Sequence, residues 1–479
     1  MSDTIMSGPF QPTMESLRTF TCPEWFRDAK FGIWSHWGPQ AVPMFGDWYA
    51  RNMYIEGSDQ YRFHWRTYGH PSKFGYKDIA KLWKAENFDP EGLMQLYVNA
   101  GARYFVGQAM HHDNFDNFDS AHNPWNSTKV GPMKDISMLW KQAAAKHGLP
   151  FGVSEHLGAS YTWMETSHRS DKQGPYAGIP YDGADPAFES LYRDNNSEYL
   201  DFADKTPLWY TSNEKYHINW FNRIKDVIDK LEPDLLYSDG GLPFGEYGQK
   251  IVAHLYNASA ARNGGKNQAV YNQKNTDPAM YKVGVLDIER GITDDILGDP
   301  WQDDTSIGDW FYNVKDVYKT AEDVVDTLVD IVSKNGNLLL NVTQKPDGTI
   351  DDEARYALEK IGAWMKDNGD GVYSTRPYKF ATEGGTKLEA GAFNEGSASW
   401  TGKDFRFTTK PGSVYAFQMR NDGGEKANIR SLGRNSEGQV KAVSVAGRAV
   451  SFEQRDGALV VDVPANPHRG MPVCIRVDF

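Results

Sequence analysis

The stretch PDLLYSDGG, residues 233–241, contains an apolar strand that ends on an aspartate followed by two glycines. The segment 216–230 before it has apolar residues at spacings of three and four, which is typical of a helix. A helix followed at once by a short apolar strand is typical of repeated βα units around a parallel sheet. In a barrel of such units, residues at the carboxyl ends of the strands form the active site. Asp239 is therefore a candidate functional residue, although an Asp-Gly pair alone more often makes a turn or caps a helix.

The same alternation extends to both sides of this stretch, from about residue 31 to about residue 368. Helical periodicity recurs in segments 133–147 and 321–334. Strand candidates, in chain order, are residues 31–37, 104–110, 150–155, 235–239, 269–271, 283–288 and 338–342, and we expect an eighth strand around 305–312. The sequence therefore predicts an α/β fold with a (β/α)8-type, TIM-like catalytic barrel.

The pattern changes after about residue 373. Short alternating strands at 413–419, 442–445 and 458–463 are separated by Gly, Asn and Asp turns, which predicts a C-terminal β-sandwich. Segment 367–377 contains two glycines and a proline, so we expect the barrel to span 1–372 and the β-sandwich domain 373–479. Two domains also suit a chain of 479 residues, which exceeds an ordinary single core. The polar segment 167–206 is expected to be an ordered insertion over the barrel mouth.

Charge and cysteine content exclude several classes of function. The formal net charge is -13 and no long Lys/Arg run is present, which argues against nucleic acid or an anionic membrane as partner. Cys22 and Cys474 are the only cysteines and are expected to be free thiols. No apolar run approaches the roughly 18 residues of a membrane helix, and residues 1–10 lack the order of a signal peptide. The compartment stays open between the cytoplasm and export of a chain produced without its signal peptide.

Aromatic residues and carboxylates near the first strand suggest a sugar site. The strand KFGIWSHWG, residues 30–38, ends by presenting His36, and FGDWY, residues 45–49, places Asp47 beside Trp48. A lone histidine at a strand end is more often structural than functional. A carboxylate beside aromatic rings, however, binds hydroxyls and covers the apolar face of a sugar, and aromatic residues make up 13% of the chain.

The segment MHHDNF, residues 110–115, follows the second strand and contains His111, His112 and Asp113. These residues suggest a metal site, but successive residues of an extended segment point in opposite directions. Neutral imidazoles that exchange hydrogen bonds with sugar hydroxyls are the simpler interpretation.

A second carboxylate is needed for glycoside hydrolysis, and VGVLDIERG, residues 283–291, offers Asp287 and Glu289. Retaining glycosidases hold two carboxyl groups about 5 to 5.5 Å apart, one as nucleophile and one as acid/base. The nucleophile must stay ionised, and burial and the nearby charge must raise the pKa of the acid.

Taken together, these motifs resemble the α-L-fucosidase family of retaining glycoside hydrolases. The resemblance covers nearly the whole predicted barrel, from PEWFRDAKFGI, residues 23–33, to VSKNGNLLLNV, residues 332–342, and KPDGTI, residues 345–350. It implies a covalent glycosyl-enzyme with Asp239 as nucleophile and Glu289 as acid/base, and an accessory C-terminal domain. It also implies a fucose pocket lined by His36, Asp47, Trp48, His111 and His112.

The sequence departs from the family pattern at several positions. Asp47 stands where many relatives carry Glu, and Met110 stands where Lys is frequent. The strand end GVSEH, residues 152–156, replaces Tyr-Tyr-Ser and brings Glu155 and His156 near the site. Gln302 occupies the place of a frequent glutamate, which strengthens Glu289 as the acid. Tyr237 and Trp301 complete the predicted substrate-binding set.

The sequence therefore predicts a retaining exo-glycosidase that removes terminal α-L-fucosyl residues from oligosaccharides or glycoconjugates without a cofactor or metal. Three alternatives remain at this point. One is a related α-L-glycosidase, for example acting on L-galactose, and another is an inactive sugar-binding barrel. The third is a metal-dependent hydrolase that uses His111, His112 and Asp113.

Overall fold

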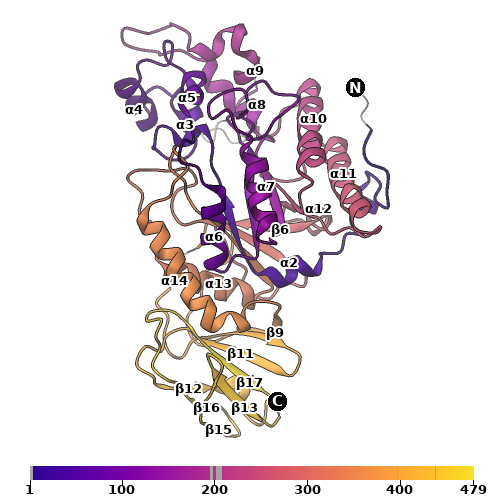
Figure 1. The fold of residues 1–479 in the computed structure, drawn as a ribbon, viewed down its shortest axis with the longest axis vertical. Helices are drawn as coiled ribbons and strands as arrows, with labels where there is room; N and C mark the ends of the chain where they lie inside the picture. Colours follow the sequence, from indigo (N-terminus) through magenta and orange to yellow (C-terminus); the bar gives the residue numbers. More distant parts are fainter. Residues whose placement is uncertain (1–3, 195–197, 201–207, 396–397, 437) are drawn as a thin grey trace.

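Eight parallel strands form a closed barrel in the order β1 to β8, with β1 pairing β8 (Figure 1). The structure is a computed structural model that describes residues 4–194, 198–200, 208–395, 398–436 and 438–479. The predicted barrel is confirmed. Its strands are β1 (Phe31–Ser35), β2 (Tyr104–Met110), β3 (Phe151–Glu155), β4 (Leu235–Ser238), β5 (Val270–Gln273), β6 (Val285–Glu289), β7 (Trp301–Ser306) and β8 (Gly336–Asn341).

Most barrel strands are apolar along their length because both of their faces are covered. Every residue of β1, β2, β3 and β4 is buried. Their inward side chains fill the barrel, where Trp34, Tyr104, Val106, Leu235 and Tyr237 belong to one apolar cluster. The barrel is therefore a packed core that supports a site at one end, not a channel.

β7 is the exception, and its predicted position was wrong. It spans Trp301–Ser306, whereas the sequence suggested a strand around 305–312. All six residues of this strand are buried, although most of them are polar. Tyr104 Oη donates a hydrogen bond to Gln302 Oε1, and Asp303 Oδ1 accepts one from the Gly291 amide. Hydrogen bonds to neighbouring elements let polar side chains of this strand be buried, so the strand has no apolar pattern.

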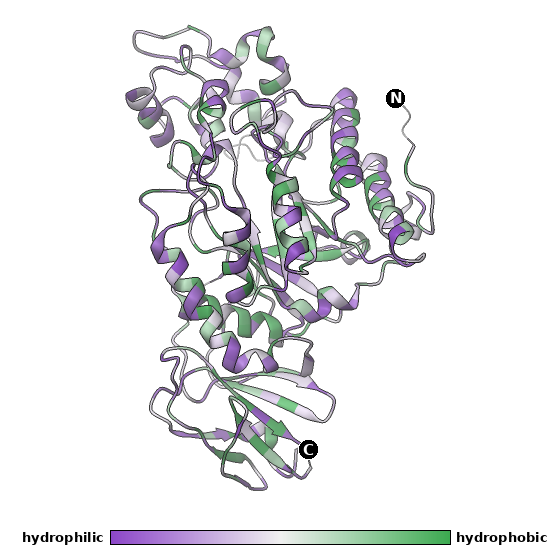
Figure 2. Ribbon diagram, viewed as in Figure 1, coloured by the Kyte–Doolittle hydropathy of each residue, from purple (hydrophilic) through white to green (hydrophobic). Residues whose placement is uncertain are grey.

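Helices surround the barrel, and Figure 2 shows hydrophilic residues along the outer side of α10. The predicted helical segments are confirmed as α7, α10 and α13. α10 begins after Asn213, whose side chain accepts a hydrogen bond from the Tyr216 amide. The longer helices are α4 (Asp59–Thr67), α5 (Tyr76–Leu82), α6 (Pro90–Asn99), α7 (Ile136–Lys146), α10 (Glu214–Leu231), α11 (Glu246–Arg262), α13 (Ala321–Ser333) and α14 (Asp352–Asn368). Shorter ones are α1 (Met14–Leu17), α2 (Glu24–Ala29), α3 (Tyr49–Asn52), α8 (Ser160–Trp163), α9 (Glu189–Tyr192) and α12 (Pro278–Tyr281).

The predicted insertion at 167–206 is ordered where the structure describes it. Asp171 accepts hydrogen bonds from the hydroxyls of Tyr61 and Tyr181 and contacts His70, which ties the insertion to α4 and the loop after it. In Figure 1, α8 and α9 lie beside α3 and α5 at one end of the molecule. Residues 195–197 and 201–207 of the predicted insertion lie outside the described residues.

The C-terminal part forms two antiparallel sheets, which confirms the predicted sandwich. One sheet has the order β14-β13-β17-β11-β10-β9 and the other has the order β12-β16-β15. Their shared core includes Phe407, Val443, Ile475, Ile429 and Val461. The strands are β9 (Arg376–Glu383), β10 (Phe405–Lys410), β11 (Ser413–Gln418), β12 (Lys426–Ile429), β13 (Ala442–Val445), β14 (Arg448–Ala449), β15 (Phe452–Gln454), β16 (Leu459–Asp462) and β17 (Val473–Asp478).

The larger sheet packs on α13 and α14, below the barrel in Figure 1. Trp364 of α14 donates a hydrogen bond to the Pro472 carbonyl, and Arg406 of β10 pairs with the buried Asp330 of α13. The boundary near residues 372 and 373 stays a prediction.

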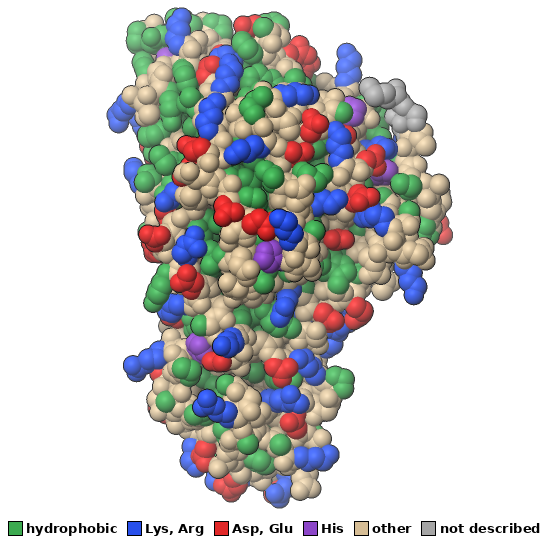
Figure 3. Space-filling model, in the orientation of Figure 1, with side chains coloured by type: hydrophobic (Ala, Val, Ile, Leu, Met, Phe, Trp, Pro, Cys, Tyr) green, Lys and Arg blue, Asp and Glu red, His purple; other side chains and the backbone are tan. Residues whose placement is uncertain are grey.

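The surface carries intermixed charges, with Lys/Arg and Asp/Glu side chains interspersed over the face drawn in Figure 3. Within the described residues, no helix has both the length and the apolar content needed to cross a bilayer. Cys22 and Cys474 are free, as predicted.

Candidate active site

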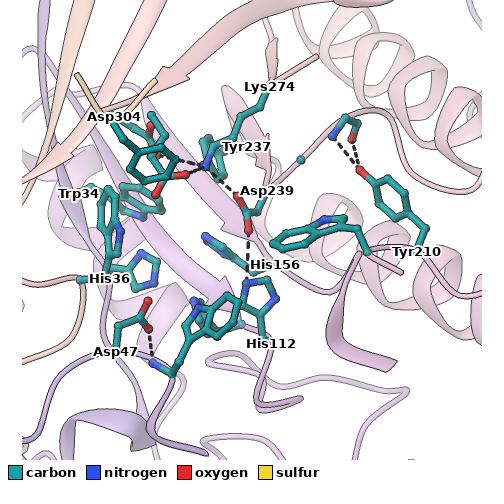
Figure 4. Close-up of a pocket in the computed structure, with 18 residues that line it drawn as sticks. Trp34, His36, Asp47, His112, His156, Tyr210, Tyr237, Asp239, Lys274 and Asp304 are labelled. Carbon is teal, nitrogen blue, oxygen red and sulfur yellow. Dashed lines mark hydrogen bonds and ion pairs between the residues drawn. The ribbon is translucent and has the colours of Figure 1, made fainter. Parts of the chain in front are cut away.

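A cavity of about 530 Å³ is lined by residues from the carboxyl ends of the barrel strands (Figure 4). His36 follows β1, His111 and His112 follow β2, His156 follows β3, and Asp239 follows β4. The complete lining is Trp34, His36, Asp47, Trp48, His111, His112, His156, Trp209, Tyr210, Tyr237, Asp239, Gly240, Gly241, Lys274, Glu289, Asp304, Trp310 and Phe393. Successive strand ends thus place most of the predicted residues around one space.

Asp239 is held at the end of β4 by its backbone and by both carboxylate oxygens. Its amide donates a 3.1 Å hydrogen bond to the Glu155 carbonyl on the neighbouring strand. Oδ2 lies 3.3 Å from His112 Nε2, and Oδ1 lies 2.8 Å from Lys274 Nζ. Gly240 has φ +100°, and a Cβ there would lie 2.6 Å from the Tyr210 hydroxyl oxygen. The glycine after Asp239 therefore allows both the turn and the close approach of Tyr210.

Lys274, the first residue after β5, connects the two candidate carboxylates. Its Nζ contacts Oδ1 of Asp239 and Oε2 of Glu289, and it lies 3.9 Å from Asp304 Oδ2. Two oxygens that bind the same nitrogen cannot be separated by more than two hydrogen-bond lengths, about 6 Å. This limit agrees with the spacing of about 5 to 5.5 Å in retaining glycosidases.

The pKa values of the two carboxyl groups are shifted in opposite directions. Burial favours the neutral form of Asp239, but the Lys274 ammonium, the hydrogen bond from His112 and the nearby His156 hold the pKa of Asp239 well below its usual range. Burial raises the pKa of Glu289; Lys274 opposes this shift, while Asp304 and Asp239 add to it. The site thus favours an ionised Asp239 beside a protonated Glu289.

The histidines provide uncharged polar groups. Burial, together with neighbouring imidazoles, lowers the pKa of His36 and His111 well below the usual value and lowers the pKa of His156 to about 3. Both ring nitrogens of His36, and Nδ1 of His112 and of His156, have no hydrogen-bond partner among the described residues. Buried ring nitrogens of this kind are suited to a ligand with several hydroxyl groups.

One histidine tautomer is fixed by its surroundings. The Ala50 amide donates to Gln40 Oε1 at 3.2 Å, which orients the Gln40 amide so that its nitrogen faces His111 Nδ1 at 2.9 Å. Nδ1 of His111 then accepts, and the ring proton lies on Nε2. His111 therefore offers a donor rather than an acceptor at Nε2.

Asp47 and Trp48 line the cavity as predicted. Asp47 Oδ1 accepts a 2.7 Å hydrogen bond from the Trp48 amide, and Trp48 has φ +58°. Burial, with Asp309 nearby, raises the pKa of Asp47 well above its usual range. The Trp48 and His112 rings meet edge to face at 5.9 Å.

A family model described as Alpha-L-fucosidase matches residues 1–370. The chain belongs to the α-L-fucosidase family. Tissue α-L-fucosidase of Macaca fascicularis is 26% identical over 476 residues, covering 97% of this chain and 89% of the relative. Plasma α-L-fucosidase of Rattus norvegicus is 28% identical over 393 residues, covering 77% and 74%. The crystal structure of Thermotoga maritima α-fucosidase in complex with fucose has a TM-score of 0.74 and 27% identity, covering 98% of this chain and 100% of that chain.

These comparisons confirm the predicted family and enzyme class. The chain is an α-L-fucosidase among the glycoside hydrolases, and a retaining mechanism is typical of the family. Nothing in the comparisons favours the alternative of a related L-sugar.

Two residues predicted to bind substrate do not reach the cavity of this fucosidase. The Glu155 carboxylate lies behind the strand ends, where it accepts hydrogen bonds from Ser238 Oγ at 2.6 Å and from the Leu157 amide at 2.9 Å. Trp301 is the first residue of β7, at the amino end of the strand, and is fully buried with Nε1 donating to the Lys334 carbonyl. Their predicted role as lining residues is corrected by this placement.

The structure also distinguishes the two candidates on β6. Glu289 lines the cavity, whereas Asp287 accepts a 2.8 Å hydrogen bond from Gln302 Nε2 inside the barrel. Among the cavity residues that the sequence prediction missed, Trp34 carried a usable signal. Trp34 lies two residues before His36 and so shares its side of the strand. Lys274 follows the polar residues Asn272 and Gln273 at the end of β5, so no apolar pattern marks it. Trp209, Tyr210, Asp304, Trp310 and Phe393 were also missed.

The metal site considered from the sequence is not assembled. Asp113 is buried and accepts a hydrogen bond from the Tyr76 hydroxyl, so it does not join His111 and His112 in the cavity. Instead, one ring nitrogen from each of His36, His111 and His156 lies within 4.8 Å of the others. Imidazole nitrogens this close together are of a kind that can bind a zinc ion.

Proposed function

We propose that Asp239 is the nucleophile and Glu289 the acid/base of retaining hydrolysis of terminal α-L-fucosyl residues, released from oligosaccharides or glycoconjugates. The single observation that supports these roles best is the Lys274 ammonium, which contacts both carboxylates in one cavity. This shared contact limits the separation of the two bonded oxygens to about 6 Å, which is compatible with retaining chemistry. The presence of a second carboxylate close to Asp239 also argues against an inactive sugar-binding barrel.

In the first step, ionised Asp239 attacks the anomeric carbon, and the bond from that carbon to the leaving oxygen breaks. Glu289 gives its proton to the leaving oxygen as the covalent ester with Asp239 forms. The ester no longer carries the negative charge of Asp239, so the pKa of Glu289 falls and the group becomes a base. Glu289 then takes a proton from the water that attacks the anomeric carbon, which releases fucose and free Asp239.

The remaining cavity residues suit recognition of a deoxy-sugar. The neutral histidines offer donors and acceptors for hydroxyl groups, and Asp47 adds a carboxyl group. Trp34, Trp48 and Trp310 supply apolar surface for a methyl group and the sugar's CH face. The fucose complex of the Thermotoga maritima relative supports this ligand.

The decisive experiment is the Asp239→Gly substitution, assayed with an aryl α-L-fucoside. We expect hydrolysis to fall by at least 10³-fold, since the covalent path is lost. Added azide should restore turnover by entering the vacated space and should give a β-L-fucosyl azide. The exposed Asp299, whose side chain is 55% exposed before β7, provides the control Asp299→Gly with unchanged activity. Undiminished hydrolysis in Asp239→Gly, with a normal thermal unfolding curve, would refute the assignment.

A further inference from the structure

A second cavity of about 520 Å³ adjoins the first one and shares Lys274, Glu289 and Phe393 with it. Its walls come from residues 287–289, 292–297 and 390–393, together with Thr276. The oxygen that Glu289 protonates connects fucose to the rest of the substrate. A leaving group must therefore extend from that oxygen past Glu289, on the side away from the fucose ring.

One wall of this second cavity comes from the chain between β9 and β10. Gly391 donates a hydrogen bond to the Ile292 carbonyl, and Phe393 donates one to the Glu289 carbonyl, both at 2.9 Å. Gly391 and Ile292 form an antiparallel bridge. Backbone hydrogen bonds thus join two segments of the cavity wall, around residues 289–292 and 391–393, that are about a hundred residues apart in the sequence.

Glu395 anchors this wall to the barrel. Its carboxylate accepts hydrogen bonds from Thr305 Oγ1 at 2.8 and 2.6 Å and from Lys319 Nζ at 2.6 Å, and its amide donates to the Arg290 carbonyl at 2.9 Å. The Glu395 side chain is only 10% exposed. Such a buried and fully bonded carboxylate fixes the position of Phe393 two residues earlier.

Phe393 is 67% exposed, which is unusual for a phenylalanine on an anchored wall. Its ring borders both cavities. Ile292, Ile296, Leu297 and Ala392 add apolar surface to the second cavity. Aromatic and aliphatic side chains around a cavity suit a flat ligand with a CH face.

We propose that this second cavity is the subsite for the leaving-group sugar, with Phe393 stacking on its apolar face. The proposal rests on the proposed function, because it takes Glu289 as the acid that separates the two sites. The exposed carboxylates of Asp294 and Asp295 line the same cavity and repel an anionic ligand. The ligand is therefore a neutral sugar rather than a sialylated or sulfated one.

The test compares Phe393→Ala with the wild type on two substrates. One is a disaccharide of fucose linked to a neutral hexose, and the other is α-L-fucosyl fluoride, whose leaving group does not fill the second cavity. The ratio of kcat/KM for the disaccharide to that for the fluoride should fall about tenfold in Phe393→Ala, and Phe393→Trp should restore it. Tyr356→Ala removes a comparably exposed aromatic residue (63%) from α14, outside both cavities, and should leave the ratio unchanged.

An unchanged ratio in Phe393→Ala would overturn the proposal, because the ring would then contribute nothing specific to the leaving group. Failure of the proposed function is distinguishable, since it shows up as wild-type behaviour in Asp239→Gly. A further arm uses Asp294→Asn combined with Asp295→Asn. This double variant should raise the relative kcat/KM for a sulfated disaccharide several-fold, and no rise would contradict the inferred preference for neutral sugars.

Discussion

The Nζ atom of Lys274 lies 2.8 Å from Oδ1 of Asp239 while also contacting Glu289. One cation therefore acts on both carboxyl groups, and it lowers the pKa of each. For Asp239 this effect supports the ionised nucleophile. For Glu289 it opposes the protonated acid, and burial together with Asp304 and Asp239 outweighs it.

Replacing Lys274 by Met should shift the whole pH profile of kcat/KM towards higher pH. Without the ammonium, the pKa of Asp239 rises, so the acidic limb, where Asp239 must lose its proton, moves up. The pKa of Glu289 rises as well, so the alkaline limb, where Glu289 loses its proton, moves in the same direction. We also expect kcat/KM at the optimum to fall by at least tenfold. Lys274→Arg keeps the charge and serves as the control. A loss of activity with both limbs in place would mean that Lys274 acts only through structure.

Replacing Glu289 by Ala should produce a loss that depends on the leaving group. Hydrolysis of an unactivated fucosyl disaccharide should fall about 10² to 10⁴-fold, since its leaving oxygen needs a proton. With α-L-fucosyl fluoride, the rate of the first step should fall much less. Added azide should yield an α-L-fucosyl azide, the opposite anomer from the one expected with Asp239→Gly. Equal losses on both substrates would contradict the role of Glu289 as acid/base.

Chelation should leave the activity unchanged, because the proposed steps use protein carboxyl groups and water only. Added Zn²⁺, in contrast, should inhibit competitively, since His36, His111 and His156 present nitrogens within 4.8 Å of one another in the substrate cavity. His156→Phe removes one nitrogen and should weaken the inhibition at least tenfold. The measurement is the inhibition constant for Zn²⁺ at fixed pH. Loss of activity in EDTA, restored by a metal, would instead support a metal-dependent enzyme.

The rule that active-site residues follow barrel strands predicted much of this site from the sequence. It identified His36, His111, His112 and Asp239, each directly after an apolar strand. Applied to β5, the rule misses Lys274, because the apolar part of that strand ends at Tyr271, and Asn272 and Gln273 follow it. Its failure at β7 has a physical reason, because most buried side chains of that strand are polar and bond to groups on neighbouring elements, so the strand has no apolar pattern.

Two kinds of residue were beyond reach of such reasoning. Glu155 and Trp301 were assigned from similarity to family motifs, but side-chain direction and position along the strand place them away from the cavity. Phe393 belongs to the chain between β9 and β10, far from the barrel motifs in sequence. Its role depends on a long-range bridge between Ile292 and Gly391, which no local pattern signals.

That bridge determines what truncation of the chain between the barrel and the C-terminal part would remove. A cut at the predicted boundary near residue 372 would remove Phe393 and Glu395, which bond to the chain at and just after Glu289. The barrel alone would keep Asp239, the proposed nucleophile, and lose the bonds that support the chain around Glu289, the proposed acid. If Phe393 contacts the leaving-group sugar as proposed, replacing the C-terminal part of this chain is expected to change the preference for the leaving group.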